Sequence, residues 1–399
     1  MPNLAIKGGD PVRTKPVLWP IVSEEEKNAV LEVLESGVWG HAMRSDCKVT
    51  HFESAFADFH GVKYAISLHG GSTALEVALR SLGIGPGDEV ITPALTWVAT
   101  QLAAVIVGAD PIFVDVSPKN YCMDPDSIEE AITERTKAII PVHLGRNLCD
   151  LDRIFAVARK YDLYVIEDCA QAHGSRYKGR LAGTIGDLGC FSFEASKIMT
   201  AGEGGMIITD NPDWAECCYS YVNAGFSYGN VPCKDENRTR WNLRMTEFQA
   251  ALLSVQLRKL EERKRKRIEN VKYLNEQLSR IDGIVPLDFD AEQNYYSYVF
   301  KYDAKSFQDL PVQRFRDALR AEGIPYFSSA SEQLAYHPSR FASPRRSYRD
   351  VHCSEAEKAR YREAVGIQGS GPLLGEKEDM DDIVKAVQKI KDHVDELLY

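Results

Sequence analysis

Short apolar runs alternate with helix-length amphipathic segments from Tyr64 onward. Segments such as Thr73–Leu82 and Leu151–Tyr161 carry apolar residues at helical spacing. Strands separated by helices of this length predict βαβ units and a mostly parallel, seven-stranded sheet with helices on both faces, an α/β fold. Seven runs have the length and composition of its strands: Tyr64–Leu68, Glu89–Pro93, Pro111–Val116, Lys137–Leu144, Tyr164–Asp168, Cys190–Phe193 and Gly205–Thr209.

The pattern changes after Met206. A long helix is predicted from Thr246 to Ile281, and the strand-like and helical segments beyond it are Tyr295–Asp303, Pro311–Gly323 and a closing helix from Met380. We therefore expect an N-terminal arm over residues 1–20, a large domain over residues 21–260 and a smaller α+β C-terminal domain over residues 261–399.

The composition fits a protein with a large core and argues against a nucleic-acid partner. The 399 residues are 44% hydrophobic and the formal net charge is -10, so a phosphate backbone would be repelled. One basic run, Arg258–Arg267, is interrupted by Glu261 and Glu262 and has no interleaved aromatic residues. This pattern is typical of the solvated face of a long helix.

Neither a metal site nor a membrane segment is predicted. The nine cysteines form no CxxC pair and no Cys/His array at zinc-ligand spacing, which favours free thiols in a reducing cytoplasm. The N-terminal residues lack the apolar core of a signal peptide. The longest apolar run, Leu102–Val107, is too short to cross a bilayer.

A candidate phosphate site lies in the segment HGGSTAL, which begins at His69. Two glycines follow a predicted strand, and Ser72 and Thr73 begin the next helix. The N-terminus of a helix offers free N–H groups and a favourable dipole to an anion. A serine after a glycine turn is also an ordinary way to begin a helix, so this segment alone leaves both interpretations open.

Two further segments carry candidate catalytic groups. Asp168 ends the strand of YVIEDCAQAHGS, at the sheet edge where ligands of open α/β sheets bind. A carboxylate there could keep a bound pyridine ring protonated, or it could cap a helix. In CFSFEASK, Ser192 faces away from its two phenylalanine neighbours, and Lys197 follows on a turn. A partly desolvated lysine is a good nucleophile and base, although most single lysines are solvated.

In combination and in this order, the motifs G-S-T-A-L, E-D-x-A-Q-A-x-G and F-S-F-x-x-x-K-x-x-x-x-G-E-G-G resemble the sugar aminotransferases of the DegT/DnrJ/EryC type. The resemblance extends from about Trp19 to the C-terminal helix. It implies the aspartate-aminotransferase-like fold, fold type I of the pyridoxal-phosphate enzymes, with pyridoxal 5'-phosphate as cofactor. Lys197 would then form the Schiff base with the cofactor, and Asp168 would pair with the pyridine nitrogen.

The resemblance also implies the other contacts to the cofactor. Gln171 is expected near the 3-oxygen, and Trp97 is expected to stack on the ring, where the family usually has Phe or Tyr. The phosphate contacts would come from the glycine turn and the neighbouring hydroxyls, at Gly71, Ser72, Thr73 and Ser192.

Asn242, in WNLRMTEFQAA, matches an asparagine that reaches the phosphate of the neighbouring subunit's cofactor in the family. The resemblance therefore implies a homodimer with composite active sites. Two departures concern the site: Gly145–Arg146 stands where many relatives carry an aromatic–glycine pair, and His69 is not typical of the motif.

The implied reaction is a ping-pong transamination from glutamine or glutamate to a keto-sugar or ketocyclitol. The stretch LAIKGGDPVRTKPVLWP resembles enzymes that act on scyllo-inosose-type ketocyclitols in aminoglycoside antibiotic biosynthesis. Nucleotide-linked keto-sugars remain open as acceptors, and 3-amino-5-hydroxybenzoate synthases share the motifs. A sugar dehydratase of this fold would carry histidine in place of Lys197, and a catalytically silent cofactor-binding regulator would not need the intact set of site residues.

Overall fold

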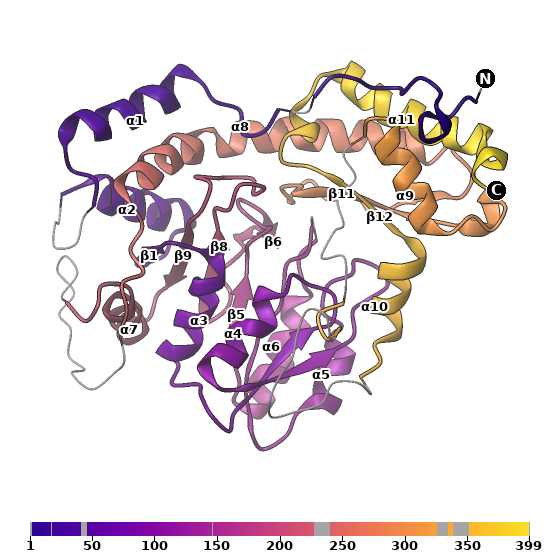
Figure 1. Ribbon diagram of the computed structural model, residues 1–399. Coiled ribbons are helices and arrows are strands. Elements are labelled where there is room, and N and C mark those ends of the chain that lie inside the picture. Colours follow the sequence, from indigo (N-terminus) through magenta and orange to yellow (C-terminus); the bar gives the residue numbers. More distant parts are fainter. Residues whose placement is uncertain are drawn as a thin grey trace.

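The computed structural model describes residues 2–16, 18–40, 46–145, 147–226, 240–324, 334–337 and 351–398. Its largest element is a seven-stranded sheet with the order β1-β9-β8-β5-β4-β2-β3 (Figure 1). The strands are β1 (Tyr64–Leu68), β2 (Glu89–Pro93), β3 (Asp110–Val114), β4 (Thr136–Ile139), β5 (Tyr164–Asp168), β8 (Leu188–Ser192) and β9 (Gly205–Thr209).

This sheet is mostly parallel, as the sequence predicts. The pairs β2–β3, β2–β4, β4–β5 and β5–β8 are parallel, and β9 runs antiparallel to both β8 and β1. Strand β4 ends at Ile139, five residues before the predicted end. The physical reason is Pro141, which has no N–H to donate to a ladder; beyond it only Val142 forms an isolated bridge, to Asp168.

Helices cover both faces of the sheet, because alternate side chains of each strand point to opposite sides. Ile166 and Ile207 pack into the core beneath α3, α4 and α7, whereas Val165 packs toward α6 and Ile208 toward α2 and α8. The helices around this sheet are α1 (Glu24–Ser36), α2 (Lys48–His60), α3 (Gly71–Ser81), α4 (Ala99–Val107), α5 (Pro125–Ala131), α6 (Leu151–Tyr161), α7 (Pro212–Val222) and α8 (Glu247–Leu278).

A second, three-stranded antiparallel sheet belongs to the C-terminal part of the chain. Its order is β10-β11-β12, and it shares an apolar core with the end of α8 and with α9 and α11. Small elements complete the fold, among them the hairpin β6 (Arg176–Tyr177) and β7 (Arg180–Leu181). The C-terminal elements are β10 (Ile284–Pro286), β11 (Ser297–Tyr302), α9 (Val312–Ala321), α10 (Ser354–Lys358), β12 (Ala364–Gln368) and α11 (Lys377–Asp392).

The long helix α8 runs from the part built on the seven-stranded sheet (the large part) to the part built on the three-stranded sheet (the small part), with α1 and α11 above it in Figure 1. The expected domain boundary at residue 260 falls inside it, and we propose that the large and small parts meet within this helix. The N-terminal arm lies against the small part: Leu4 is buried in its core, and Arg13 pairs with Asp379 at 2.6 Å. The arm is not wholly extended, since Ala5–Lys7 forms a short 3-10 helix.

Among the helices that the structure describes, none is both long enough and apolar enough to cross a membrane. The basic run Arg258–Arg267 lies on α8, as predicted, but it is not a purely solvated face. Lys264 and Arg267 are buried, and the cations of this helix contact both the N-terminal segment and the C-terminal part.

Candidate active site

A cavity of about 460 Å³ lies where the parallel strands of the large sheet end. The segments that follow β1, β2, β4, β5 and β8 all contribute to its wall, and Tyr296, the residue before β11, also lines it. Seven of the nine residues singled out in the sequence line this single cavity: Gly71, Ser72, Trp97, Asp168, Gln171, Ser192 and Lys197.

The glycine turn and Ser192 form one side of the cavity. Helix α3 begins at Gly71, and no side chain caps its N-terminus, so its first N–H groups have no partner within the helix. A Cβ atom at Gly71 would lie 2.4 Å from the Cβ of Ser192. Only glycine allows this approach, and the result is a cradle of N–H and hydroxyl groups suited to a phosphate.

Asp168 lies at the floor of the cavity, at the end of β5. Its carboxylate accepts hydrogen bonds from the Thr100 hydroxyl (3.0 Å) and the Ala170 N–H (3.2 Å). Burial raises the pKa of Asp168 above its ordinary value; those two donors and the charge of Lys197 oppose the shift without cancelling it. A buried carboxylate of this kind is stabilised by a cationic N–H donor placed in the cavity.

Lys197 lies on the loop that leaves β8. Its Nζ atom is 4.7 Å from the ring centroid of Tyr296, within the range of a cation–π contact. The Tyr296 hydroxyl lies 2.9 Å from the Ser196 hydroxyl, and the Glu194 carboxylate accepts from the Ser196 N–H at 3.0 Å. Hydrogen bonds therefore connect Glu194, Ser196 and Tyr296 beside Lys197.

Gln171 and Trp97 complete the predicted set inside the cavity. The Gln171 side-chain oxygen accepts a hydrogen bond from the N–H of Gly145, a residue with a positive φ of 69°. The amide nitrogen of Gln171 can donate to a ligand in the cavity that this residue lines. Trp97 is 51% exposed, so its ring face is available at the mouth of the cavity. Arg146, the next residue of the unusual Gly145–Arg146 pair, lies outside the described residues.

The other two predicted residues do not line this cavity. The Thr73 hydroxyl points to the neighbouring side of α3, 3.4 Å from the His69 ring. Asn242 is exposed and forms an isolated backbone bridge with Asn223. The segment that contains Asn242 is nonetheless near the glycine turn, because the carbonyl of the next residue, Leu243, accepts a hydrogen bond from the His69 N–H at 2.9 Å.

The cavity is also lined by residues that the sequence did not single out, among them Thr96, Thr100, Glu194 and Tyr296. Glu194 lies in the CFSFEASK segment, three residues before Lys197, and this closeness to Lys197 could have identified it as a cavity residue. Tyr296 comes about 100 residues later, and only the packing of the small part against the large one brings it there.

A buried pair lies directly behind Asp168. His143 and Glu167 are 3.0 Å apart, and the His143 Nδ1 atom accepts from the Cys149 N–H, which makes Nε2 the donor to Glu167. Together with Cys169 these atoms lie within 4.8 Å of one another, as metal ligands would. However, Glu167 also accepts from the N–H groups of Gly183, Ile185 and Gly186, so the protein satisfies this carboxylate by itself.

The donors and acceptors of the cavity fit pyridoxal 5'-phosphate. The uncapped N-terminus of α3 and Ser192 match the phosphate, the buried carboxylate of Asp168 matches a protonated ring nitrogen, and the Lys197 amine matches the aldehyde. Trp97 supplies an aromatic face. The cofactor would therefore be held between the glycine turn and the end of β5.

Comparison with known proteins agrees with this cavity. The DegT/DnrJ/EryC1/StrS aminotransferase family matches residues 20–388. The L-glutamine:2-deoxy-scyllo-inosose aminotransferase of Streptoalloteichus tenebrarius is 36% identical over 424 residues, covering 99% of both chains. An aminotransferase structure from Psychrobacter cryohalolentis superposes with a TM-score of 0.87 at 31% identity, covering 95% of this chain and 100% of that one. A 3-amino-5-hydroxybenzoic acid synthase gives 0.85 at 29% identity, covering 97% and 100%.

Proposed function

The chain belongs to the DegT/DnrJ/EryC1/StrS aminotransferase family and is a pyridoxal-phosphate-dependent aminotransferase, and from this premise we propose that it transfers the amino group of glutamine to a ketocyclitol. The observation that carries the proposal is the nearly full-length match to an enzyme named for that donor and that class of acceptor. The expected fold and cofactor class are confirmed by the same comparisons. The dehydratase and regulator alternatives are not favoured.

The charge of the cavity supports a small acceptor without phosphate. The charged side chains that line it among the described residues are the acids Asp168, Glu194 and Glu203 and the single base Lys197. A nucleotide-linked sugar would bring a diphosphate toward this acidic wall, in addition to the phosphate of the cofactor. A neutral cyclic polyol brings hydroxyl groups, which donate hydrogen bonds to carboxylates.

Asp168 and Lys197 divide the chemistry between them. When bound, pyridoxal phosphate supplies an aldehyde that links covalently to amines and a ring that withdraws electrons from the carbon being deprotonated. Asp168 would accept a hydrogen bond from the ring nitrogen and keep it protonated. The Lys197 amine, freed when the donor's amine replaces it, would take the proton from the donor's α-carbon and deliver it to the cofactor. With the keto acceptor, Lys197 would move the proton in the opposite direction.

A panel of acceptors tests the proposed substrate class. The holoenzyme is incubated with glutamine and, separately, with 2-deoxy-scyllo-inosose, scyllo-inosose and a nucleotide-linked 4-keto-sugar, and the amine products are identified by mass spectrometry. We expect amination of a ketocyclitol and no reaction of the nucleotide-linked sugar. Glutamate in place of glutamine should react more slowly. Amination of the nucleotide-linked sugar alone would refute the proposed acceptor.

We also propose a homodimer with composite sites. Asn242 is exposed and does not line the cavity of its own chain, which leaves its side chain free to reach a neighbour. Large apolar side chains are exposed as well: Trp241, next to Asn242 in the sequence, is 70% exposed, and Trp97 at the mouth of the cavity is 51% exposed. Exposed apolar surface of this kind is typical of protein–protein contacts.

Mixing two inactive variants tests this arrangement. Lys197→Ala and Asn242→Ala subunits are combined after mild dissociation and reassociation. In a mixed dimer with shared sites, one site carries both lesions and the other carries neither, so we expect up to about half of wild-type activity per mixed dimer. If Asn242 served its own chain, each site would keep one lesion and mixing would restore nothing. Sedimentation gives the oligomeric state of each sample.

A further inference from the structure

Two backbone carbonyls immediately before Lys197 are held by side chains from distant parts of the chain. The indole N–H of Trp19 donates to the Ala195 carbonyl at 3.0 Å. The hydroxyl of Ser370, which follows β12, donates to the Ser196 carbonyl. The peptide groups that precede Lys197 are therefore fixed from outside the loop, one by the N-terminal segment and one by the small part.

The loop itself has little regular structure to hold Lys197 in place. It follows β8 in a series of turns and includes no helix or strand between Ser192 and Gly205. Inside the cavity, Ser196 contacts Tyr296 and Glu194, and Tyr296 lies under the Lys197 ammonium. These contacts hold the side chain of Ser196, whereas the external donors hold the two backbone carbonyls that immediately precede Lys197.

Trp19 is in turn placed by two arginines of α8. The guanidinium carbon atoms of Arg263 and Arg267 lie 6.0 Å and 5.9 Å from its ring centroid, within or at the limit of a cation–π contact. Arg263 also donates to the Ile21 carbonyl at 3.4 Å. The same helix therefore contacts both the Trp19 ring and the backbone two residues later.

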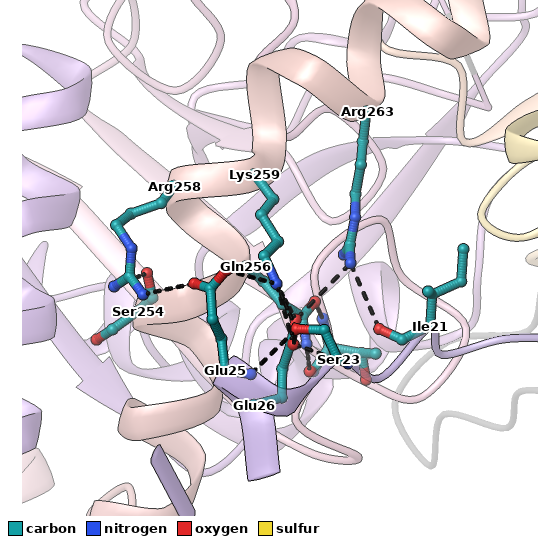
Figure 2. Close-up of polar contacts among 10 residues, drawn as sticks. Ile21, Ser23, Glu25, Glu26, Ser254, Gln256, Arg258, Lys259 and Arg263 are labelled. Atoms are coloured by element: carbon teal, nitrogen blue, oxygen red, sulfur yellow. Dashed lines mark hydrogen bonds and ion pairs between the residues drawn. The ribbon is translucent and has the colours of Figure 1, made fainter. Parts of the chain in front are cut away.

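The residues that follow Trp19 are fastened to α8 by a partly buried charge cluster (Figure 2). Glu26 is 1% exposed; Lys259 lies 3.1 Å from its carboxylate and Arg263 lies 3.7 Å from it. Burial alone would raise the pKa of Glu26, but the hydrogen bonds from Ser23 and Lys259 outweigh it and lower the pKa to about 2. Glu26 is therefore charged at neutral pH, and the ion pairs are present.

Arg267 connects this arrangement to Ser370. Its side chain is fully buried and donates to the carbonyls of Gly369 (3.2 Å) and Ser370 (2.9 Å) and to the Asn294 side chain (3.3 Å). Within the described parts of the chain it has no ion pair with a carboxylate. One turn of α8 thus organises both donors that reach the Lys197 loop.

We propose that Trp19 and Ser370 are positioning residues that hold the Ala195 and Ser196 carbonyls and thereby set the position of the Lys197 amine in the cavity. Neither side chain needs to touch the cofactor or the substrate. The proposal rests on the proposed role of Lys197 and adds to it a function for the end of the N-terminal arm, where Trp19 contacts both α8 and the active-site loop.

The test is Trp19→Phe, which removes the N–H donor and keeps an aromatic ring over the two arginines. We expect kcat to fall about 5- to 50-fold, because loss of one hydrogen bond and a small displacement of a reacting group both act on the chemical step, while KM for the acceptor changes less than about twofold. The rate at which the apoenzyme forms its covalent link with pyridoxal phosphate, followed by absorbance, should fall by a similar factor.

Two further variants and the wild-type protein make the outcome decisive. Trp214→Phe, a tryptophan on α7 that packs against Tyr164 away from the cavity, should behave as wild type in both assays. Ser370→Ala should also slow the formation of the covalent link with pyridoxal phosphate. If thermal unfolding shows that Trp19→Phe does not fold, the Ser370→Ala result alone tests the proposal. Wild-type rates of capture and turnover in folded Trp19→Phe and Ser370→Ala would overturn the positioning role. Failure of the wild-type protein to take up pyridoxal phosphate would instead contradict the proposed function.

Discussion

Replacing Lys197 by alanine is expected to lower turnover by more than about 10⁴-fold, since it removes both the amine that links to the cofactor and the base that moves the proton. The variant should still bind pyridoxal phosphate, because the glycine turn, Ser192 and Asp168 are untouched. Its absorbance should be that of the free aldehyde rather than of a lysine-linked cofactor. Steady-state assays with glutamine and a ketocyclitol give the loss of turnover.

Lys160→Ala is the matched control for this change. Lys160 lies on α6 in an exposed ion pair with Glu129 and does not line the cavity. Exposed pairs contribute little to stability, so activity and unfolding temperature should remain close to those of the wild type. Substantial turnover in Lys197→Ala would mean that another amine performs the proton transfer.

Replacing Asp168 by asparagine should lower turnover by roughly 10³-fold, a loss comparable to the removal of a strong electrostatic contact to a transition state. A neutral amide does not stabilise a protonated ring nitrogen, so the ring withdraws electrons less effectively. The fold should survive, because the amide retains an acceptor oxygen and the Thr100 hydroxyl can reverse its role toward Thr96, 3.0 Å away.

Asp187→Asn is the matched control for Asp168→Asn. Asp187 is another aspartate whose pKa is raised by burial; it accepts from the Val165 N–H at 2.7 Å and does not line the cavity. We expect this variant to lose stability in thermal unfolding but to keep its turnover per folded molecule. Equal turnover losses in the two variants would point to a general effect of the amide on the fold rather than to a contact with the ring.

The order of strands and helices could be predicted from the sequence because the sheet is buried on both faces. Buried strands such as Tyr164–Asp168 and Gly205–Thr209 are centred on short apolar runs, and the predicted bounds of both agree with the structure. The carboxyl ends of neighbouring strands then bring Asp168 and Ser192 together. The two motif segments and the glycine turn meet in one cavity for this reason.

Contacts between segments that are far apart in the sequence leave no comparable pattern of apolar residues. Tyr296 is one of several buried tyrosines around the start of β11, and their pattern indicates only a core strand. Trp19 lies in the N-terminal arm, where apolar residues show no periodicity. The positions of Tyr296 and Trp19 beside the Lys197 loop depend on how the small part and α8 pack, which no local pattern encodes. Thr73 shows the opposite case: its place in the motif predicted a phosphate contact, but the first turn of α3 directs its hydroxyl toward His69.

The central claim, that Lys197 holds the cofactor, is tested most directly by locating the covalent link. The holoenzyme is reduced with borohydride, which fixes a lysine-linked pyridoxal phosphate permanently, and the digested protein is analysed by mass spectrometry. We expect the cofactor on the peptide that contains Lys197, and on no other lysine. Modification of a different lysine, with Lys197 unmodified, would contradict the assignment.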